Sequence, residues 1–228
     1  MAVLRIQRHV LVAAALLPLL LAACRIEKID VAAAAAPSAP SPAGSFDNKA
    51  FDPSKQVAAM WDDKVLPAVR ARAEDFDKLR AAMRADLNAA GARHGWRERG
   101  EGAPWSMSTR LVGKVVSVDT ESSVGKVGVD VDGDGKADAL VQIGPVMRGT
   151  SLRDGLSFVS FTQYANQIDY AQLANAFNQR AYDTALKSLP RDRLMGRTVH
   201  VLGTFAANGD DDEPPQILPV EFKLDDVR

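Results

Sequence analysis

The spacing of hydrophobic residues divides the chain after residue 45 into a helical part and a β-rich part. Over residues 46–104, apolar side chains recur every three or four positions, which is the period of an amphipathic helix. Pro67 is expected to bend or divide the first helix, and Gly91 is expected to end the second. We therefore predict a helical hairpin subdomain over residues 46–104. Its two apolar stripes are Val57, Met60, Trp61 and Val65, then Phe76, Leu79, Met83 and Leu87.

From residue 105 onward, five short stretches have the pattern of strands: the first is rich in valine, and in the others apolar and polar residues alternate, which is the period of a half-buried strand. The stretches are 111–119, 127–131, 139–143, 198–201 and 218–224. A helical stripe over 169–189 separates the third stretch from the fourth, and Pro219 places the last strand at an edge or beside a bulge. This is the element order of the OB-fold, although the same elements can be arranged otherwise. We therefore predict an α+β chain in which residues 105–228 form a five-stranded OB-like β-barrel with an inserted helix.

The N-terminal residues have the layout of a secretory signal. Arg5 and Arg8 precede an apolar core that is too short to cross a bilayer, which needs about 20 apolar residues. Small residues then lead to Cys24, the single cysteine of the chain, in an arrangement that resembles the lipobox of bacterial lipoproteins. We predict that residues 1–23 are a signal peptide and that Cys24 carries fatty acyl chains such as palmitate. The alternative is an ordinary signal peptide that contains a cysteine. Arg25, in place of aspartate, favours the outer membrane.

Residues 24–45 are rich in alanine, proline and serine and lack large apolar side chains, which is the composition of a tether. Without Arg5 and Arg8, the 28 basic residues become 26 against 29 acidic ones, a net charge of −3. This balance lacks the basic footprint of nucleic-acid binding. With one cysteine, the chain cannot form an internal disulfide. We therefore expect a packed fold on the periplasmic side of the envelope, held to the membrane by its lipid and without a nucleic-acid partner.

The sharpest local motif lies between the second and third predicted strands. Its candidate ligands, four carboxylates and one backbone carbonyl, belong to Asp130, Asp132, Asp134, Lys136 and Asp138. Oxygen ligands at this spacing, with a glycine at the sixth position, suit Ca²⁺. The twelfth position holds Val141 where an EF-hand has glutamate, so the motif resembles the strand-loop-strand calcium loops of integrin-type propellers instead. The alternative is a plain hairpin whose Asp-Gly turns face water. Four aspartates repel one another without a cation, and both interpretations stay open.

A second polar cluster follows the third predicted strand. Its members are Arg148, Thr150, Arg153, Asp154, Asn166 and Gln167. Two arginines with hydroxyl and amide partners suit a carboxylate, a phosphate or the hydroxyl groups of a sugar. In the alternative interpretation these residues are structural: Arg153 pairs with a nearby aspartate, Thr150 caps a helical turn, and the two amides tie down the loop before the helix.

Sequence motifs for catalysis are missing from the chain. The mature sequence has two histidines, His94 and His200, and neither belongs to a zinc-ligand spacing. The chain also lacks a G-x-S-x-G nucleophile motif and a phosphate-binding glycine loop. We therefore expect a protein that is not an enzyme.

Four stretches of the sequence are distinctive: WDDKVLP (61–67), GKVVSVDTESSVGKVG (113–128), IGPVMRGTSLRD (143–154) and FTQYANQIDYAQLANA (161–176). Together with the lipobox and the tether, they resemble a family of predicted periplasmic lipoproteins of unknown function that are often encoded beside sugar ABC transporters. The resemblance implies an OB-like barrel beside a helical subdomain. It also implies an accessory role around carbohydrate uptake, and it supplies no catalytic residues.

Two functions fit these observations. The chain is expected to be an interaction protein that docks on an envelope protein, such as a component of a sugar ABC transporter; the alternative is a module that binds a sugar or an anion. A docking protein predicts a sizeable apolar patch on its surface. A ligand-binding module predicts a concave site lined by the polar cluster around Arg148.

Overall fold

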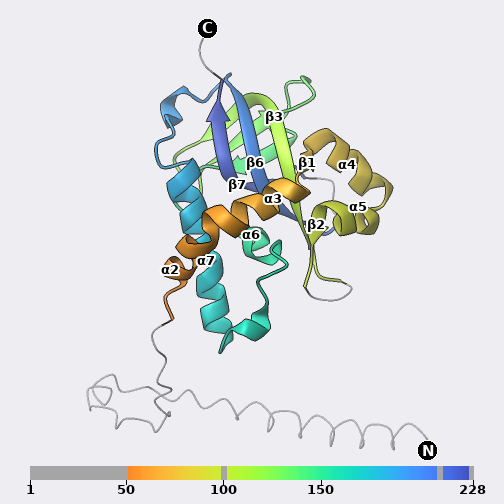
Figure 1. Cartoon of the computed structure of the whole chain (residues 1–228). Helices are drawn as coiled ribbons and strands as arrows, with labels where there is room; N and C mark the ends of the chain where they lie inside the picture. The colour runs from red at the N-terminus through yellow and green to blue at the C-terminus, as the bar shows by residue number, and fades with distance from the viewer. Residues whose placement is uncertain (1–50, 99–101, 210–212, 226–228) are drawn as a thin grey trace, which may run out of the picture. The chain divides into compact units, whose positions relative to one another are not determined.

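The computed structural model describes residues 51–98, 102–209 and 213–225 (Figure 1). All of them belong to one contact unit of the chain, Lys49–Arg228. The predicted signal peptide, Cys24 and the tether lie outside the described residues, so these assignments stay predictions. Within the described ranges, no helix is both long and apolar enough to span a membrane.

Five strands of the β-rich half close into a barrel. They are β3 (Trp105–Asp119), β4 (Lys126–Asp130), β5 (Ala139–Gln142), β6 (Thr198–Ala207) and β7 (Gln216–Leu224). Antiparallel pairs join β3 to β4, β4 to β5, β6 to β7 and β3 to β6, and a parallel pair joins β5 to β7. The strands therefore follow one another as β3-β4-β5-β7-β6 and return to β3. This closed arrangement confirms the predicted OB-like fold class.

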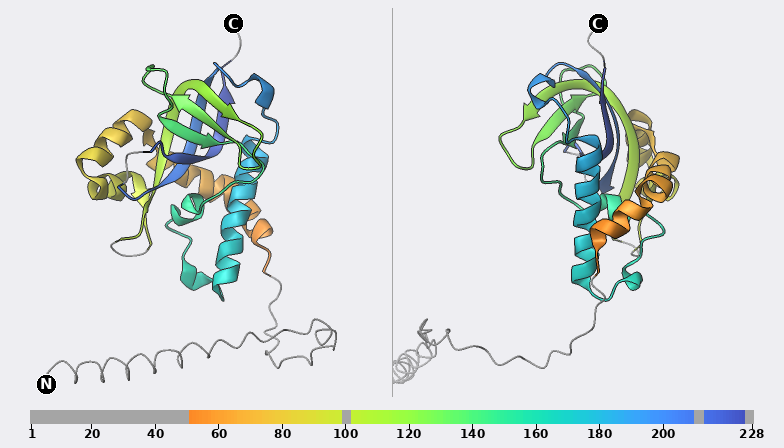
Figure 2. Two further views of the ribbon diagram at one scale, coloured as in Figure 1. Left: turned by 180° about the vertical axis from the view of Figure 1, so that it is seen from behind. Right: turned by 60° about the vertical axis from the view of Figure 1, so that its left-hand side comes forward.

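Strand β3 takes part in both sides of the closure because it is long and curved (Figure 2). Its first part pairs with β6 and its last part with β4, and Lys114 belongs to both ladders. A register shift after Val115 marks a β-bulge, which bends a strand. A Cβ atom on Gly113 would lie 2.3 Å from the backbone oxygen of Asp130, so only glycine fits where β3 meets β4 without displacing the backbone.

Pro219 lies beside a bulge, as the sequence predicts. The register of β6 and β7 shifts between Leu202 and Gly203, and Gly203 is the partner of Pro219. The parallel pairing of β7 with β5 ends at Ile217, before the proline. The missing N–H of Pro219 therefore falls where the ladder is already irregular.

Alternating side chains of the strands fill the barrel. Those that are almost fully buried include Leu111, Val115, Val127, Val129, Val141, Val199 and Val201. Helix α7 (Gln167–Ala185) packs against β7 and buries the predicted stripe of Tyr170, Leu173, Phe177 and Ala181. Three short helical turns connect it to the strands: α6 (Ser151–Asp154), η4 (Phe161–Gln163) and η5 (Arg191–Arg193).

The first N-terminal helix runs in three segments, α2 (Pro53–Met60), the π-helical η3 (Trp61–Val65) and α3 (Leu66–Arg72). The carboxylate of Asp52 caps α2 by accepting from the Lys55 N–H at 3.0 Å. Pro67 lies in the first turn of α3, so the division at this proline is as expected. The buried stripe of Val57, Trp61, Val65 and Val69 faces inward. Segment α2 packs on α7, and α3 packs on β3 and β6.

The second N-terminal helix is divided at Asp86 into α4 (Phe76–Ala85) and α5 (Leu87–His94), which pack on each other beside the barrel (Figure 1). The expectation that Gly91 ends this helix is wrong. Gly91 lies inside α5, where the indole of Trp105 covers it and leaves no room for a side chain: a Cβ atom there would lie 2.2 Å from Trp105 Cδ2. The helix instead ends before Gly95.

Two short strands fix both ends of the α4–α5 pair to the barrel. β1 (Glu74–Asp75) precedes α4 and pairs with β3 in parallel, while β2 (Gly95–Trp96) follows α5 and pairs with β3 antiparallel. The helical residues thus cover the barrel in two places: α2 packs on α7 and α3 on β3 and β6, whereas α4 and α5 pack on each other and on β3.

Candidate functional site

The segment that follows β5 is held by two buried amide side chains. Gln142, the last residue of β5, donates from Nε2 to the backbone oxygen of Arg148 at 2.9 Å and accepts the Arg148 N–H at 2.7 Å. Asn178 of α7 donates from Nδ2 to the backbone oxygen of Gly149 at 2.9 Å. Both amides are almost fully buried, 3 % and 4 % exposed. We call this arrangement the amide clamp. It fixes the backbone of Arg148 and Gly149, which belong to no helix or strand.

The amide clamp leaves the side chains of its segment exposed. Arg148 is exposed, and within the described residues its guanidinium has no hydrogen-bond or ion-pair partner. Gly149 has a φ of 99°, in the left-handed region that other residues adopt only with strain, and no atom lies within 4 Å of the position where its Cβ would be. Thr150, also exposed, stands before α6 without a side-chain cap hydrogen bond.

Two surface hollows meet at this segment, and both are lined by Arg148, Gly149 and Thr150. The first, of about 460 Å³, lies against the barrel, and we call it the barrel-side hollow. Its other polar lining residues are Gln142, Ser151, Asn208, Glu213 and Gln216. The second, of about 450 Å³, lies against α7, and we call it the helix-side hollow. Its other lining residues include Val146, Met147, Ala171, Ala174, Asn175 and Asn178.

Arg153 faces inward and is 8 % exposed. Its Nε and Nη2 atoms lie 2.7 Å from a carboxylate oxygen of Asp154, and its Nη1 donates to the backbone oxygen of Tyr170 at 2.9 Å. The guanidinium also stacks over the Tyr170 ring, 3.7 Å from its centroid. Arg153 therefore has the pairing with Asp154 that the structural interpretation expects, and it joins α6 to α7.

A third, smaller hollow of about 280 Å³ lies beside this pair and is lined in part by Thr150, Arg153 and Asp154. In the wall of this hollow, the Tyr170 hydroxyl donates to a carboxylate oxygen of Glu98 at 3.3 Å. A carboxylate oxygen of Asp154 lies 3.5 Å from the same hydroxyl. Burial raises the pKa of Tyr170 to about 12; the nearby Arg153 acts in the opposite direction, and the two carboxylates add to the rise. The Tyr170 hydroxyl therefore stays protonated at neutral pH. Glu98 was not predicted, since its partner lies 72 positions away in the sequence.

Asn166 and Gln167 lie apart from the other predicted ligand residues. The side-chain amide oxygen of Asn166 accepts the Asp169 N–H at 2.9 Å, and so caps α7. Gln167 is the first residue of that helix and is exposed. Neither residue lines the three hollows around the amide clamp. The structure therefore brings together Arg148, Thr150, Arg153 and Asp154, and places the two amides elsewhere.

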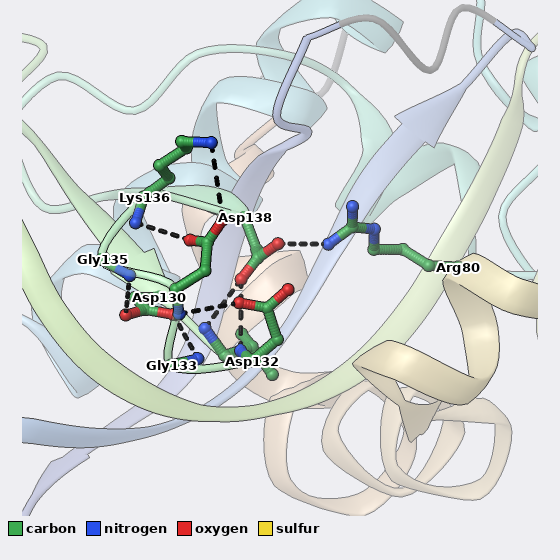
Figure 3. A network of polar contacts seen from close by, with 9 residues as sticks. Arg80, Asp130, Asp132, Gly133, Gly135, Lys136 and Asp138 are labelled. Atoms are coloured by element: carbon green, nitrogen blue, oxygen red, sulfur yellow. Dashed lines mark hydrogen bonds and ion pairs between the residues drawn. The ribbon is translucent and has the colours of Figure 1, made fainter.

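The aspartate loop between β4 and β5 is closed by its own backbone (Figure 3). Asp130 accepts the N–H of Gly133 at 2.7 Å with one oxygen and the N–H of Gly135 at 2.9 Å with the other. Both glycines have a φ of 85°, as expected for Asp-Gly turns. Asp138 accepts the Val131 N–H at 2.8 Å and an N–H of the Arg80 guanidinium from α4.

Three of the five predicted metal ligands come together. Asp130, Asp132 and Asp138 each have a carboxylate oxygen within 4.8 Å of the others. Asp134 is outside this group and instead accepts the Lys136 N–H at 2.7 Å. Three carboxylates can supply part of the six to eight oxygens that Ca²⁺ needs. Calcium stays a prediction for this loop.

Arg80 gives the aspartate loop a positive charge that the sequence pattern did not reveal. Its ion pair with Asp138 links α4 to the barrel (Figure 3). Burial alone would raise the pKa of Asp138, but the hydrogen bonds from Val131, Arg80 and the neighbouring backbone outweigh it and lower that pKa. The repulsion among the aspartates, which suggested a bound cation, is therefore relieved in part by a guanidinium.

Comparisons with known proteins agree with this architecture. A solved OB-fold protein from Thermotoga maritima MSB8 superposes with a TM-score of 0.62; it is 15 % identical, and the match covers 78 % of this chain and 100 % of that one. At this identity the likeness shows the fold alone. No curated protein matches the sequence. The family described as "Predicted periplasmic lipoprotein (DUF2291)" matches residues 13–223. The chain therefore belongs to this family of predicted periplasmic lipoproteins.

Proposed function

We propose that this protein binds a saccharide in the barrel-side hollow and acts as an accessory protein of sugar uptake, anchored to the periplasmic side of the envelope through Cys24. The lining of the hollow supports a hydroxyl-rich ligand. It combines the amides of Asn208 and Gln216, the hydroxyl of Thr150, one arginine and one glutamate. Such a set offers donors and acceptors in similar number, which suits sugar hydroxyls better than a strong anion or an apolar ligand.

The amide clamp is the observation that carries this proposal. Two buried side chains, one from β5 and one from α7, fix the backbone on which Arg148 stands. A segment held in this way loses little conformational freedom when a ligand binds, and this lowers the cost of binding. Strand β5 and the β6–β7 connection are also the third strand and the fourth loop of the barrel, a region that OB-folds use for oligosaccharides and oligonucleotides. The net negative charge of the chain favours the saccharide.

Docking on a transporter protein has less support from the surface. A docking protein predicts a sizeable apolar patch. Among the described residues the exposed large hydrophobic side chains are Val112, Val146, Ile168 and Met195. They come from β3, the segment after β5, α7 and the segment before β6, so they do not form one stripe of a single element. A transporter component as partner rests on the family resemblance of the sequence.

Calorimetric titration of the lipidated protein with a panel of neutral and acidic sugars tests this proposal. The protein is kept in a detergent without a sugar headgroup. Arg148→Ala is expected to weaken binding of the recognised sugar about tenfold to a hundredfold, because a hydrogen bond from a charged group contributes about 1.5–3 kcal/mol. Arg93→Ala is the matched control, since Arg93 is an exposed arginine of α5 that lines none of the hollows around the amide clamp.

Two outcomes would contradict the proposal. In the first, no sugar of the panel binds the parent protein. In the second, Arg148→Ala and Arg93→Ala change the affinity equally, which would place the sugar at another site.

A further inference from the structure

The barrel-side and helix-side hollows share one rim. Arg148, Gly149 and Thr150 line both of them, so the two hollows are neighbours on either side of the segment held by the amide clamp. One hollow is lined by the end of β5, by Asn208 and by residues 213–216, and the other by residues of α7. A ligand that fills the first hollow therefore ends at the edge of the second.

Gly149 adds no side chain to the rim that the two hollows share. Its φ of 99° selects glycine, and nothing lies within 4 Å of the position of a Cβ atom there. This differs from Gly91 and Gly113, whose missing side chains are replaced at close range by Trp105 and by the backbone of Asp130. At Gly149 the space that a side chain would take stays empty, as it does at Gly196, but Gly149 also lines both hollows.

The helix-side hollow adds a different kind of lining. Val146 is 46 % exposed there, beside the small side chains Ala171 and Ala174 of α7. Asn175, exposed on the same helix, offers an amide. Sugar rings present C–H faces as well as hydroxyl edges, and this mixture of apolar and amide groups can contact both.

We infer that the ligand is an extended saccharide chain of several units that lies across Gly149 and occupies both hollows. The inference rests on the proposed function and names the class of its ligand. Each hollow, at about 450 to 460 Å³, is in the lower part of the range of small-molecule pockets, about 300–1,000 Å³. A single sugar occupies one hollow, whereas a chain of several units contacts both hollows in one binding event.

The dependence of affinity on chain length tests this inference. The probes are malto-, cello-, xylo- and manno-oligosaccharides of one to six units, titrated into the lipidated protein. Affinity for the recognised series is expected to rise at least about tenfold from one unit to four, and then to level off as the hollows are filled.

Gly149→Asn is the variant that separates the two hollows. Asparagine tolerates the left-handed backbone better than other side chains, and its amide would stand on the rim that the two hollows share. The gain in affinity with chain length, taken as the ratio of the affinities for four units and for one unit, is expected to disappear. Gly196→Asn is the matched control, because Gly196 also has a positive φ, 75°, and open space around its Cβ position, but lines neither hollow. Asn175→Ala is expected to weaken only the longer chains.

The outcomes distinguish this inference from the proposed function on which it rests. Equal affinity for one unit and for four, with Arg148→Ala still weakening both, would overturn the extended chain and keep the saccharide site. Absence of binding throughout the series would overturn both. Backbone strain could make Gly149→Asn and Gly196→Asn lower the affinity equally. In that case Asn175→Ala decides: an unchanged affinity for the four-unit chain would overturn the inference. A loss of affinity for the four-unit chain alone would support it.

Discussion

The aspartate loop and the amide clamp are both ordered connections that flank β5, but they are ordered by different means. In the loop, Asp130 and Asp138 accept hydrogen bonds from backbone N–H groups three to seven positions away. In the clamp, Gln142 holds the backbone of Arg148 six positions away, and Asn178 reaches the backbone of Gly149 across 29 positions. The loop uses its own polar side chains to hold itself. The clamp borrows side chains from β5 and α7, and so leaves Arg148 available for a ligand.

The comparison distinguishes a loop that is ordered by its own side chains from a segment whose side chains stay available to a ligand because other elements hold its backbone. A turn that satisfies its own carboxylates has fewer lone pairs to offer an ion or a ligand. A segment held from behind offers its side chains in a fixed position. The following predictions test the two kinds of order, beginning with the largest effect.

Gln142→Leu is expected to destabilise the protein by about 2–3 kcal/mol, because it leaves the partly buried backbone N–H and backbone oxygen of Arg148 without their partners. Saccharide binding should fall with it, even under conditions where the variant is folded. The measurement is urea unfolding followed by calorimetric titration. Gln172→Leu, an exposed position of α7, serves as control and should change stability by less than about 0.5 kcal/mol. Equal stability of both variants would mean that the clamp does not order the segment.

Arg80→Met is expected to lower stability by about 1 kcal/mol, since it removes a partly exposed ion pair and keeps the length of the side chain. The calcium interpretation of the aspartate loop predicts that millimolar Ca²⁺ raises Tm, and raises it more in this variant, because the guanidinium no longer competes for Asp138. The plain-hairpin interpretation predicts no response in either protein. Thermal melts in Ca²⁺ and in EDTA decide between them, and Asp132→Asn should abolish any response to the ion.

Acid should weaken the aspartate loop in a defined direction. The pKa of Asp138 is lower in the folded protein than in the unfolded chain, where it is about 3.9. Its contribution to stability is therefore fully present above the unfolded value, and is lost as the pH falls through the folded value. The free energy of unfolding, measured between pH 6 and pH 3, should fall less steeply for Asp138→Asn than for the parent protein. Parallel curves would show that Asp138 does not contribute to the acid sensitivity.

Much of the fold could be predicted because its signals are local. The alternation of valines marks β4 and β5, and a helical stripe marks α7. The first residues of β3 could not be predicted in this way. Ser106, Ser108 and Thr109 are buried although they are polar, and α4, α5 and α6 all pack on β3, so the strand does not alternate between buried apolar and exposed polar residues here.

In the candidate site, too, contacts between sequence neighbours could be predicted and contacts between distant residues could not. The pairing of Arg153 with Asp154 joins neighbours in the sequence and was one of the expected alternatives. The ion pair of Arg80 with Asp138 spans 58 positions, and Gln142 and Asn178 have no pattern that distinguishes a clamping amide from an ordinary polar residue. Such contacts depend on how the strands and helices assemble, so a single sequence carries no sign of them.

The closure of the barrel also sets the order in which the chain can fold. The hairpins from β3 to β5 can form from neighbouring residues, but Trp105 at the start of β3 pairs with Ala207 at the end of β6. Contacts of such long range are slow to form. In a chain that emerges N-terminus first, the edge of β3 therefore stays unpaired until nearly the whole sequence is present, and during that interval it is a site where strands of other chains can add.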